Sequence, residues 1–273
     1  MYRKPVVALL STGNEIIDLQ SPKPHSGDGW GGIFDTNRPS LQAALEGMGY
    51  EVLDLGVVPD ELVLSTIHSW PLMEVYSVQS HVTAIQRGIN EADILLTTGG
   101  TSMGPTDLLK PVIERHFKGT IHFGRVTIKP GKPTTFASIP IPGEGNKSKP
   151  IFALPGNPAS ALVTFHVFVV PALRKLGGWP QELCQLPRVY VKLQNSMRLD
   201  PRTEFHRVII RAGTDGLEAS STGGQRSSRV ASLSGANGLV VLPPRKESGP
   251  QNLELGEKVE AVMIGEINMV YDK

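Results

Sequence analysis

The sequence predicts an α/β fold, a parallel-sheet sandwich with helices on both faces, followed by a small all-β domain. Three observations support this prediction. Short continuous apolar runs, typical of strands buried on both faces, recur through the first two-thirds of the 273 residues. Segments with helical features separate these runs, which indicates right-handed crossovers between parallel strands. From Val189 onward, short alternating runs separated by turn residues replace the helices.

Apolar runs and helix signals place the elements of the first part in order. Buried strands are predicted at residues 6–10, 94–98 and 151–154, and residues 51–58 are strand-like. Residues 120–139 alternate and carry glycines and prolines, which favours paired strands or a long hairpin. Helices are predicted at residues 37–48, 82–90, from 105 or 106 to about 117, and 158–176. Asn37 or Asp35 can cap the first helix, and Pro171 is expected to kink or end the last.

The change of sequence character near Gly177 divides the chain. The predicted α/β domain covers residues 1–177, a linker covers 178–186, and the β-rich domain covers 187–273. Two stretches are interpreted as insertions. Residues 25–32 are rich in glycine and polar side chains, and residues 61–79 have mixed hydrophobicity without a clear period. Because a structureless segment of this length is unusual inside a compact domain, residues 61–79 are expected to protrude or be disordered.

The composition excludes several classes of protein. Charge is nearly balanced, with 27 Lys+Arg against 26 Asp+Glu, which argues against a general nucleic-acid binder. The single Cys184 cannot form an internal disulfide and has no partner for a zinc site. No apolar run approaches the length needed to cross a membrane. A cytoplasmic protein is therefore expected, in which any anion site is local.

Three strand ends carry similar turns. Residues 11–15 (STGNE), 97–107 (TTGGTSMGPTD) and 155–160 (PGNPAS) each follow an apolar run. In a parallel sheet these turns lie on one edge, outside the carboxyl ends of the strands, where open α/β folds bind ligands. Glycines let the backbone approach a ligand, and amides before a helix form an anion cradle, to which Thr101 and Ser102 add hydroxyl donors. Each turn alone is more typical of plain turn chemistry, but three on one edge favour a phosphate-bearing ligand.

Asp107 has two interpretations. On spacing alone, a carboxylate in the first turn of a helix is stabilised by the helix dipole. Beside an anion cradle, however, a carboxylate repels the ligand unless a cation mediates, and Mg²⁺ commonly uses one or two carboxylates together with substrate phosphates. Glu15 and Asp60 follow strands on the same predicted edge and could join such a site.

The segment IKPGKPTTFA supplies basic side chains. Lys129 and Lys132 flank a Pro-Gly pair, and the neighbouring prolines reduce the entropy lost when a small oxyanion or a pyrophosphate binds. Lysines in an ordinary hairpin are usually solvated, and this alternative stays open. In the β-rich part, Arg207, Arg229 and Ser232 add cationic and hydroxyl donors, although each of them alone is more typical of a solvated surface.

Eight motifs together resemble one family. They are, in chain order, STGNE, DTNRPSL, LTTGGTSMGPTDLLK, HFGRVTIKPGKPTTFA, FALPGNPASALV, LDPRTEFHR, SSRVASLSGANGLVVLPP and GEKVEAVMIG. This order is similar to that of the molybdopterin molybdenumtransferase family, which includes the bacterial MoeA proteins, plant and fungal homologues and the gephyrin E domain. The resemblance spans essentially the whole chain except the two insertions, and it implies a molybdopterin-binding-like α/β fold.

Members of this family insert molybdate into adenylylated molybdopterin and release AMP, and the resemblance implies this Mg²⁺-dependent activity here. It implies that the substrate is bound by Thr12, Gly13, Glu15, Gly99, Gly100, Thr101, Ser102, Gly104, Pro133, Pro155, Gly156 and Asn157. It also implies catalytic roles for Asp107, Lys129, Lys132 and Ser160, a metal site at Asp60 and Asp107, and a molybdate position at Arg207 and Ser232. A homodimer and a handover of substrate from the adenylyltransferase are implied as well.

Three departures from the family pattern affect these expectations. The family carries two further N-terminal subdomains, one of which completes the partner's site in a dimer, so low activity is expected of this chain alone. Residues 61–79 lengthen the segment just after Asp60, where the family is shorter. Ser234 and Gly235 stand where the family often has Arg-Ser, which removes a cationic contact.

Two other functions stay open. The adenylyltransferase that makes the adenylylated intermediate resembles the first domain, including its Gly-Gly turn, but the KPGKP stretch and the β-rich part favour the molybdotransferase. The other alternative is a gephyrin-like scaffold that binds receptor peptides. No segment of the sequence identifies a peptide groove, and aromatic residues make up only 6% of the chain, so the scaffold ranks third.

Overall fold

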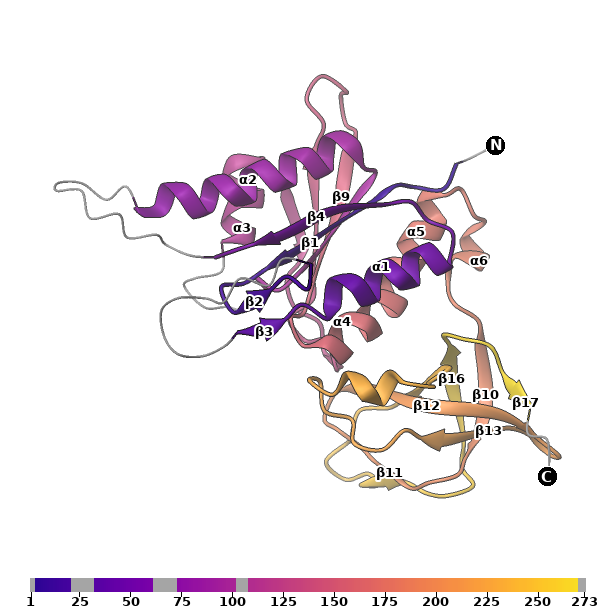
Figure 1. The fold of residues 1–273 in the computed structure, drawn as a ribbon. Coiled ribbons are helices and arrows are strands. Elements are labelled where there is room, and N and C mark those ends of the chain that lie inside the picture. The colour runs from indigo at the N-terminus through magenta and orange to yellow at the C-terminus, as the bar shows by residue number, and fades with distance from the viewer. Residues whose placement is uncertain (1–2, 21–31, 61–72, 102–107, 270–273) are drawn as a thin grey trace. The chain divides into compact units, whose positions relative to one another are not determined.

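The computed structural model describes residues 3–20, 32–60, 73–101 and 108–269, which form two compact units (Figure 1). The first unit comprises Met1–Arg125 and Pro133–Gly156, and the second comprises Val126–Lys132 and Asn157–Lys273. The chain therefore passes between the units three times. The domain boundaries drawn from the change of sequence character stay a prediction.

A six-stranded sheet forms the centre of the first unit in the described part of the chain. Its strands, in spatial order, are β4 (Val52–Val58), β1 (Val7–Thr12), β5 (Ile94–Thr98), β9 (Ser148–Leu154), β8 (Thr135–Pro140) and β6 (Thr120–Phe123). The first four are parallel, and β8 and β6 continue the sheet in antiparallel fashion. The three predicted buried strands, the strand predicted at 51–58 and the paired strands within 120–139 are confirmed, and β4 is mostly half-buried. A short parallel ladder also joins β2 (Ile16–Ile17) to β3 (Ile33–Phe34).

Burial on both faces explains the continuous apolar runs. All residues of β1 and β5 are buried. On one face packs α2 (Met73–Glu91), whose Val82 and Ile85 belong to the same buried cluster as Ala8 of β1. The helix α1 (Asn37–Gly47) lies along the opposite face of the sheet (Figure 1). The predicted α/β fold with helices on both faces is therefore confirmed.

One helix begins earlier than predicted. The helix predicted from Val82 begins at Met73, so part of the segment expected to be irregular is helical. Val78, Val82 and Ile85 continue one apolar stripe, which the mixed residues around Trp70 obscured. Residues 25–31 and 61–72 of the expected insertions lie outside the described residues.

The helix predicted from residue 105 or 106 is present from Leu109. It consists of α3 (Leu109–Pro111) and a π-helical turn, Val112–His116. Its predicted start also lies outside the described residues.

A closed β-barrel forms the core of the second unit. Its strands pair in the order β12 (Thr203–Gly213), β14 (Gly238–Leu242), β16 (Lys258–Met263), β10 (Arg188–Leu193) and β13 (Gly216–Ser221), and β13 pairs back with β12. Val191, Val208 and Val240 belong to the buried cluster inside it. Shorter pairings join β7 (Ile128–Lys129) and β17 (Asn268–Met269) to β12, and β11 (Met197–Arg198) to β15 (Asn252–Leu253). The predicted small all-β domain is confirmed.

The predicted helix 158–176 is present in the second unit with one widened turn. A π-helical turn, Phe165–Val169, joins α4 (Pro158–Thr164) to α5 (Val170–Leu176). Pro171 has no N–H for the carbonyl of Val167, so the hydrogen-bond ladder is interrupted there. The expectation that no apolar segment is long enough to cross a membrane is wrong by length and composition, because among the described residues this one helix meets both criteria. Half of it is buried, however, and the core helix of a soluble protein passes the same test. A short helix, α6 (Gln181–Cys184), follows.

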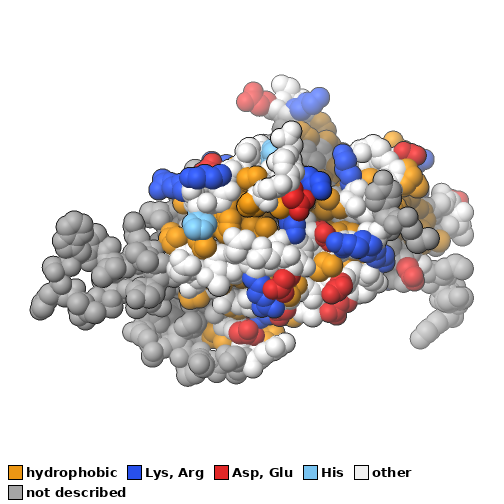
Figure 2. Space-filling model, turned by 90° about the horizontal axis from the view of Figure 1, so that it is seen from above, with side chains coloured by type: hydrophobic (Ala, Val, Ile, Leu, Met, Phe, Trp, Pro, Cys, Tyr) orange, Lys and Arg blue, Asp and Glu red, His pale blue; other side chains and the backbone are white. Residues whose placement is uncertain are grey.

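Charged side chains of both signs are interspersed over the face shown in Figure 2. Surface ion pairs in the first unit include Arg3–Asp93 at 2.6 Å, Arg87–Glu91 at 3.2 Å and Lys147–Glu144 at 3.1 Å. Exposed pairs of this kind contribute little to stability. Any attraction for an anionic ligand must therefore come from local groups.

His166, in the widened turn, predicts a pH-dependent loss of stability. Its Nδ1 is buried without a hydrogen-bond partner among the described residues, and burial lowers its pKa from 6.5 to about 4. The folded state then binds fewer protons than the unfolded state below pH 6.5. Above pH 6.5, His166 is neutral in both states and costs no stability. As the pH falls from 6.5 toward 4, the free energy of unfolding should fall by about 2 kcal/mol. Urea unfolding at pH 7 and pH 4.5 should show a smaller loss for His166→Phe than for the wild type. Equal losses would contradict this assignment.

Candidate functional site

Three turns meet at one edge of the sheet in the first unit. Since β1, β5 and β9 are parallel neighbours, the residues that follow them lie at the same carboxyl edge. The Gly99 amide donates to the Leu154 carbonyl at 3.3 Å, and the hydroxyl oxygens of Ser11 and Thr98 lie 3.0 Å apart. The edge thus brings together eight of the predicted site residues: Thr12, Gly13, Glu15, Gly99, Gly100, Thr101, Pro155 and Gly156.

Two glycines shape the first two of these turns. Gly99 has a φ of +84°, and a Cβ there would lie 2.2 Å from the carbonyl oxygen of Thr12. Gly13 has a φ of +143°, and a Cβ there would lie 2.7 Å from Oε2 of Glu15, whose side chain folds back toward the turn. A larger residue would be strained at either position and would collide with its neighbour. The second turn can therefore approach Thr12 only because position 99 lacks a side chain, whereas Gly13 leaves room for the Glu15 side chain within its own turn.

A buried ion cluster beside this edge was missed by the sequence reasoning. Arg38, which is 6% exposed, pairs with Asp18 at 2.9 Å, with Asp35 at 3.1 Å and with Asp54. Burial opposes the charge of Arg38, but its carboxylate partners outweigh burial and raise its pKa. The neighbouring Asn37 donates from Nδ2 to the Gly156 carbonyl at 2.8 Å. The available signal was Asp35 and Arg38, three residues apart at the start of a helix.

Asp60 follows β4 at the same edge. Its Oδ1 lies 3.0 Å from Nε2 of His81, which is fully buried in α2. Ser102, Gly104 and Asp107 lie outside the described residues. Within the part of the chain that the structure describes, no three His, Cys, Asp or Glu side chains are grouped to hold a metal ion. Mg²⁺ takes few protein ligands when substrate phosphates supply the others, so the single carboxylate of Asp60 is compatible with a magnesium site at this edge.

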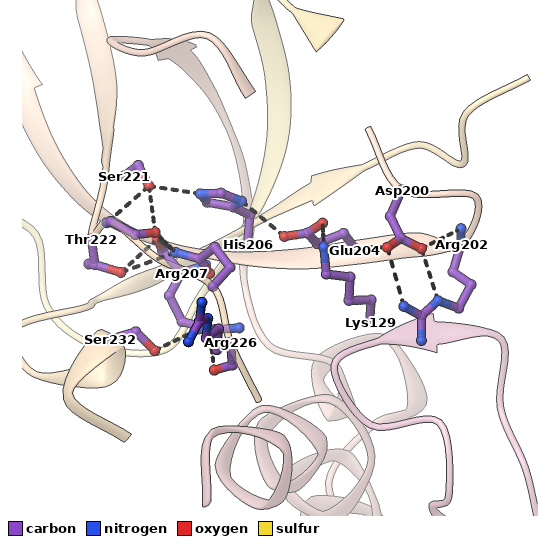
Figure 3. Close-up of polar contacts among 12 residues, drawn as sticks. Lys129, Asp200, Arg202, Glu204, His206, Arg207, Ser221, Thr222, Arg226 and Ser232 are labelled. Atoms are coloured by element: carbon purple, nitrogen blue, oxygen red, sulfur yellow. Dashed lines mark hydrogen bonds and ion pairs between the residues drawn. The ribbon is translucent and has the colours of Figure 1, made fainter. Parts of the chain in front are cut away.

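In the second unit, two carboxylates hold Lys129 (Figure 3). Its Nζ lies 3.0 Å from Oε2 of Glu204 and 3.4 Å from Oδ2 of Asp200. The Lys129 side chain is 32% exposed, whereas Lys132 is exposed. A hollow of about 330 Å³ adjoins the Lys129 side chain and is lined by Lys129, Arg198, Leu199, Asp200, Pro201 and Arg245.

Arg207 is fully buried on β12. Its Nε donates to the Ser232 hydroxyl at 3.0 Å, and its Nη2 donates to the Arg226 carbonyl at 3.3 Å. Its Nη1 is buried and has no hydrogen-bond partner in the described parts of the chain. Burial lowers the pKa of Arg207 to about 10, while the nearby Glu204 acts in the opposite direction. A buried guanidinium with an unsatisfied nitrogen destabilises the folded state unless an anion accepts a hydrogen bond from that nitrogen.

The remaining predicted residues of this region are divided between the units. Pro133 belongs to the first unit, and Asn157 and Ser160 belong to the second. Ser160 is buried in the first turn of α4, where the Ala159 amide already donates to the Ser227 carbonyl at 3.0 Å. The N-terminus of α4 therefore offers fewer amides to a ligand than the sequence suggested.

The strand β12 carries a second charged group that the sequence reasoning did not assign. His206 lies 3.1 Å from Glu204 through Nδ1 and 2.8 Å from the Ser221 hydroxyl through Nε2 (Figure 3). Burial opposes ionisation of Glu204, but its hydrogen bonds with His206 and Lys129 outweigh burial and lower its pKa. The Arg202 hydrogen bond lowers the pKa of Asp200 to about 2. The signal was a run of charged residues within a strand-like segment, LDPRTEFHR.

Two family models match the two parts of the chain. Residues 77–175 match the family described as a probable molybdopterin binding domain, and residues 190–264 match the MoeA C-terminal region (domain IV). The fold agrees with these two matches, since an α/β unit is joined to a β-barrel. The chain is a protein of the MoeA and gephyrin E-domain type.

Individual relatives agree with this classification. The chain is 37% identical to "Gephyrin" of Dictyostelium discoideum, over 97% of this chain and 37% of that protein. It is 32% identical to "Molybdopterin molybdenumtransferase" of Haemophilus influenzae, over 94% of this chain and 56% of that protein. A solved MoeA structure from Pyrococcus horikoshii is 29% identical, with a TM-score of 0.67, over 97% of this chain and 55% of that one. The chain thus spans about a third to just over half of these proteins.

Proposed function

We propose that this chain inserts molybdate into adenylylated molybdopterin with release of AMP, as a step of molybdenum cofactor biosynthesis. The observation that carries the proposal is Arg207, a buried guanidinium beside the Ser232 hydroxyl whose Nη1 has no partner in the described residues. Planar guanidinium groups bind oxyanions through charge-assisted hydrogen bonds. Molybdate, a small dianion, would satisfy this nitrogen.

The sheet edge of the first unit is the proposed position for the phosphate-bearing part of the substrate. Its turns offer backbone amides held close by glycines, and the buried hydroxyls of Thr12 and Thr101 lie beside them. Amides and hydroxyls of this kind suit phosphate oxygens. The charge balance of the chain agrees with a local site rather than a broad basic surface.

The proposed chemistry needs positive charge where the link to AMP breaks. Lys129 and Lys132 would stabilise the negative charge that develops on the departing phosphate, and Ser160 would contribute a hydroxyl. Asp60 and Asp107 would hold Mg²⁺, which when bound neutralises phosphate charge. A homodimer and the handover of substrate from the adenylyltransferase belong to the same proposal.

The test is a direct assay of the purified chain. Adenylylated molybdopterin, molybdate and Mg²⁺ are supplied, AMP is measured by chromatography, and molybdenum in the product is measured by mass spectrometry. We expect AMP release that depends on molybdate and matches the molybdenum incorporated. A folded chain that binds neither molybdate nor adenylylated molybdopterin would reject the proposal.

Asp107→Asn separates the two interpretations of this carboxylate. If Asp107 holds the metal, the variant should lose Mg²⁺-dependent AMP release by about 100-fold or more, since an amide is a poor Mg²⁺ ligand. If Asp107 is only a helix cap, turnover should persist and stability should change by less than about 1 kcal/mol, because Asn caps as well as Asp. The matched control is Glu114→Gln, at an exposed position of the helix that follows. Full AMP release by folded Asp107→Asn would reject the catalytic role.

A further inference from the structure

A line of four polar groups runs across the second unit and ends at Lys129 (Figure 3). The Ser221 hydroxyl lies 2.8 Å from His206 Nε2, and His206 Nδ1 lies 3.1 Å from Glu204 Oε1. The other oxygen of that carboxylate, Oε2, lies 3.0 Å from Lys129 Nζ. Each group in the line thus fixes the orientation of the next.

Burial distinguishes Glu204 from the other carboxylate near Lys129. The Glu204 side chain is 2% exposed, whereas that of Asp200 is 16% exposed and lies farther from Nζ, at 3.4 Å. Asp200 is also hydrogen-bonded to Arg202 through both of its oxygens. A buried carboxylate is stable only when it is paired, and the partners of Glu204 are Lys129 and His206. Glu204 is therefore the principal partner of the ammonium group.

The backbone supports the same pairing. β7 has only two residues, and its parallel pairing with β12 places Lys129 directly beside Glu204. Nearby, Gly131 has a φ of +115°, and a Cβ there would lie 2.3 Å from Thr164 of α4. The segment that carries Lys129 is thus held by the barrel strand on one side and by a helix close to Gly131.

We propose that Glu204 is a positioning residue for Lys129, with His206 and Ser221 holding its carboxylate. The buried carboxylate limits the range of positions open to the ammonium group, on a side chain that also lines the hollow with Arg198 and Arg245. A preorganised ammonium needs no rearrangement when the negative charge of a phosphate develops beside it. This last step rests on the proposed function, whereas the positioning of Lys129 does not.

The first experiment measures how accessible the amine is, without substrate. The full chain is acetylated briefly with an amine-reactive ester, and labelling of each lysine is quantified by peptide mass spectrometry. Lys147, whose side chain is 74% exposed, serves as the reference within the same digest. Glu204→Gln should raise labelling of Lys129 relative to Lys147 about tenfold, the effect of losing one charge-assisted hydrogen bond. Glu204→Asp, which keeps the charge on a shorter side chain, should give an intermediate value.

The matched control is Glu260→Gln. Glu260 pairs with Arg188 at 2.8 Å in the same barrel, but it is 37% exposed and distant in the chain from β7. This variant should leave the labelling of Lys129 unchanged. If Glu204→Gln does not fold, His206→Gln removes the ring that holds the carboxylate and should raise Lys129 labelling about threefold, a smaller loss because Glu204 itself remains. Wild-type labelling of Lys129 in a folded Glu204→Gln or His206→Gln chain would overturn the proposal.

The second experiment uses the molybdate insertion assay. Glu204→Gln should lower kcat about tenfold with KM for adenylylated molybdopterin nearly unchanged, because the loss concerns orientation in the transition state. Glu204→Asp should recover part of kcat. Unchanged kcat together with raised labelling would overturn the role of Glu204 in the reaction. An inactive wild-type chain would count against the proposed function, and the labelling experiment would still decide the positioning of Lys129.

Discussion

Gly99→Ala is expected to destabilise the first unit by about 3 kcal/mol and to abolish ligand binding at the sheet edge. About 1 kcal/mol comes from forcing a residue with a side chain to the φ of +84°. The rest comes from overlap, since the new Cβ would lie 2.2 Å from the Thr12 carbonyl oxygen, which is backbone of a buried strand and cannot move aside cheaply. The measurement is the free energy of unfolding in urea.

Gly56→Ala is the matched control for this change. Gly56 lies in β4 of the same unit with a φ of +78°, and apart from its chain neighbours no atom of the described residues lies within 4 Å of the position that its Cβ would take. Gly56→Ala should therefore lower the free energy of unfolding only by the cost of the backbone conformation, about 1 kcal/mol. Equal losses at both positions would mean that the turn after β5 moves away from Thr12 without cost.

Arg207→Gln is expected to lower molybdate-dependent turnover about 100-fold, the effect of losing a charge-assisted hydrogen bond worth about 2–3 kcal/mol. Folding should respond in the opposite direction. Because the variant removes a buried cation whose Nη1 has no hydrogen-bond partner among the residues that the structure describes, the free energy of unfolding should stay constant or rise. Lower turnover together with unchanged or higher stability is expected of a residue that serves function at the expense of stability.

The control for this second change is Arg211→Gln, an exposed position on the same strand. It should change neither turnover nor stability by a measurable amount. Full turnover by Arg207→Gln, accompanied by a stability loss of several kcal/mol, would show that Arg207 is structural. Turnover assays and urea unfolding on the same preparations give both quantities.

Local signals in the sequence were sufficient for most of the fold. Residues 94–98 form a strand with the predicted bounds because five consecutive buried residues leave no other interpretation beside a glycine turn. The start of α2 was wrong because the residues before Val82 are mixed in polarity and follow a Trp-Pro break. Only packing on the sheet shows that Val78 continues the apolar stripe.

The candidate site could be predicted in part for a similar reason. Glycine turns after buried strands are visible in sequence, and the strand order then brings them together. The pairing of Lys129 with Glu204 depends on the register of β7 against β12, which joins residues far apart in the chain. No local pattern encodes that register. The sequence therefore proposed Lys129 and Arg207 as candidates but missed Glu204, which pairs with Lys129, and His206, which lies within hydrogen-bonding distance of Glu204.

The three passages of the chain between the two units limit how this protein can be divided or shuffled during evolution. A module joined by one linker can be transferred to another gene by a single exchange. Here, a single break at residue 157 would leave residues 126–132 behind, and β12 would lose its pairing with β7 and Lys129. Each unit has its own hydrophobic core, yet neither is a contiguous piece of sequence. We therefore expect the two units to be inherited together, as a single genetic module.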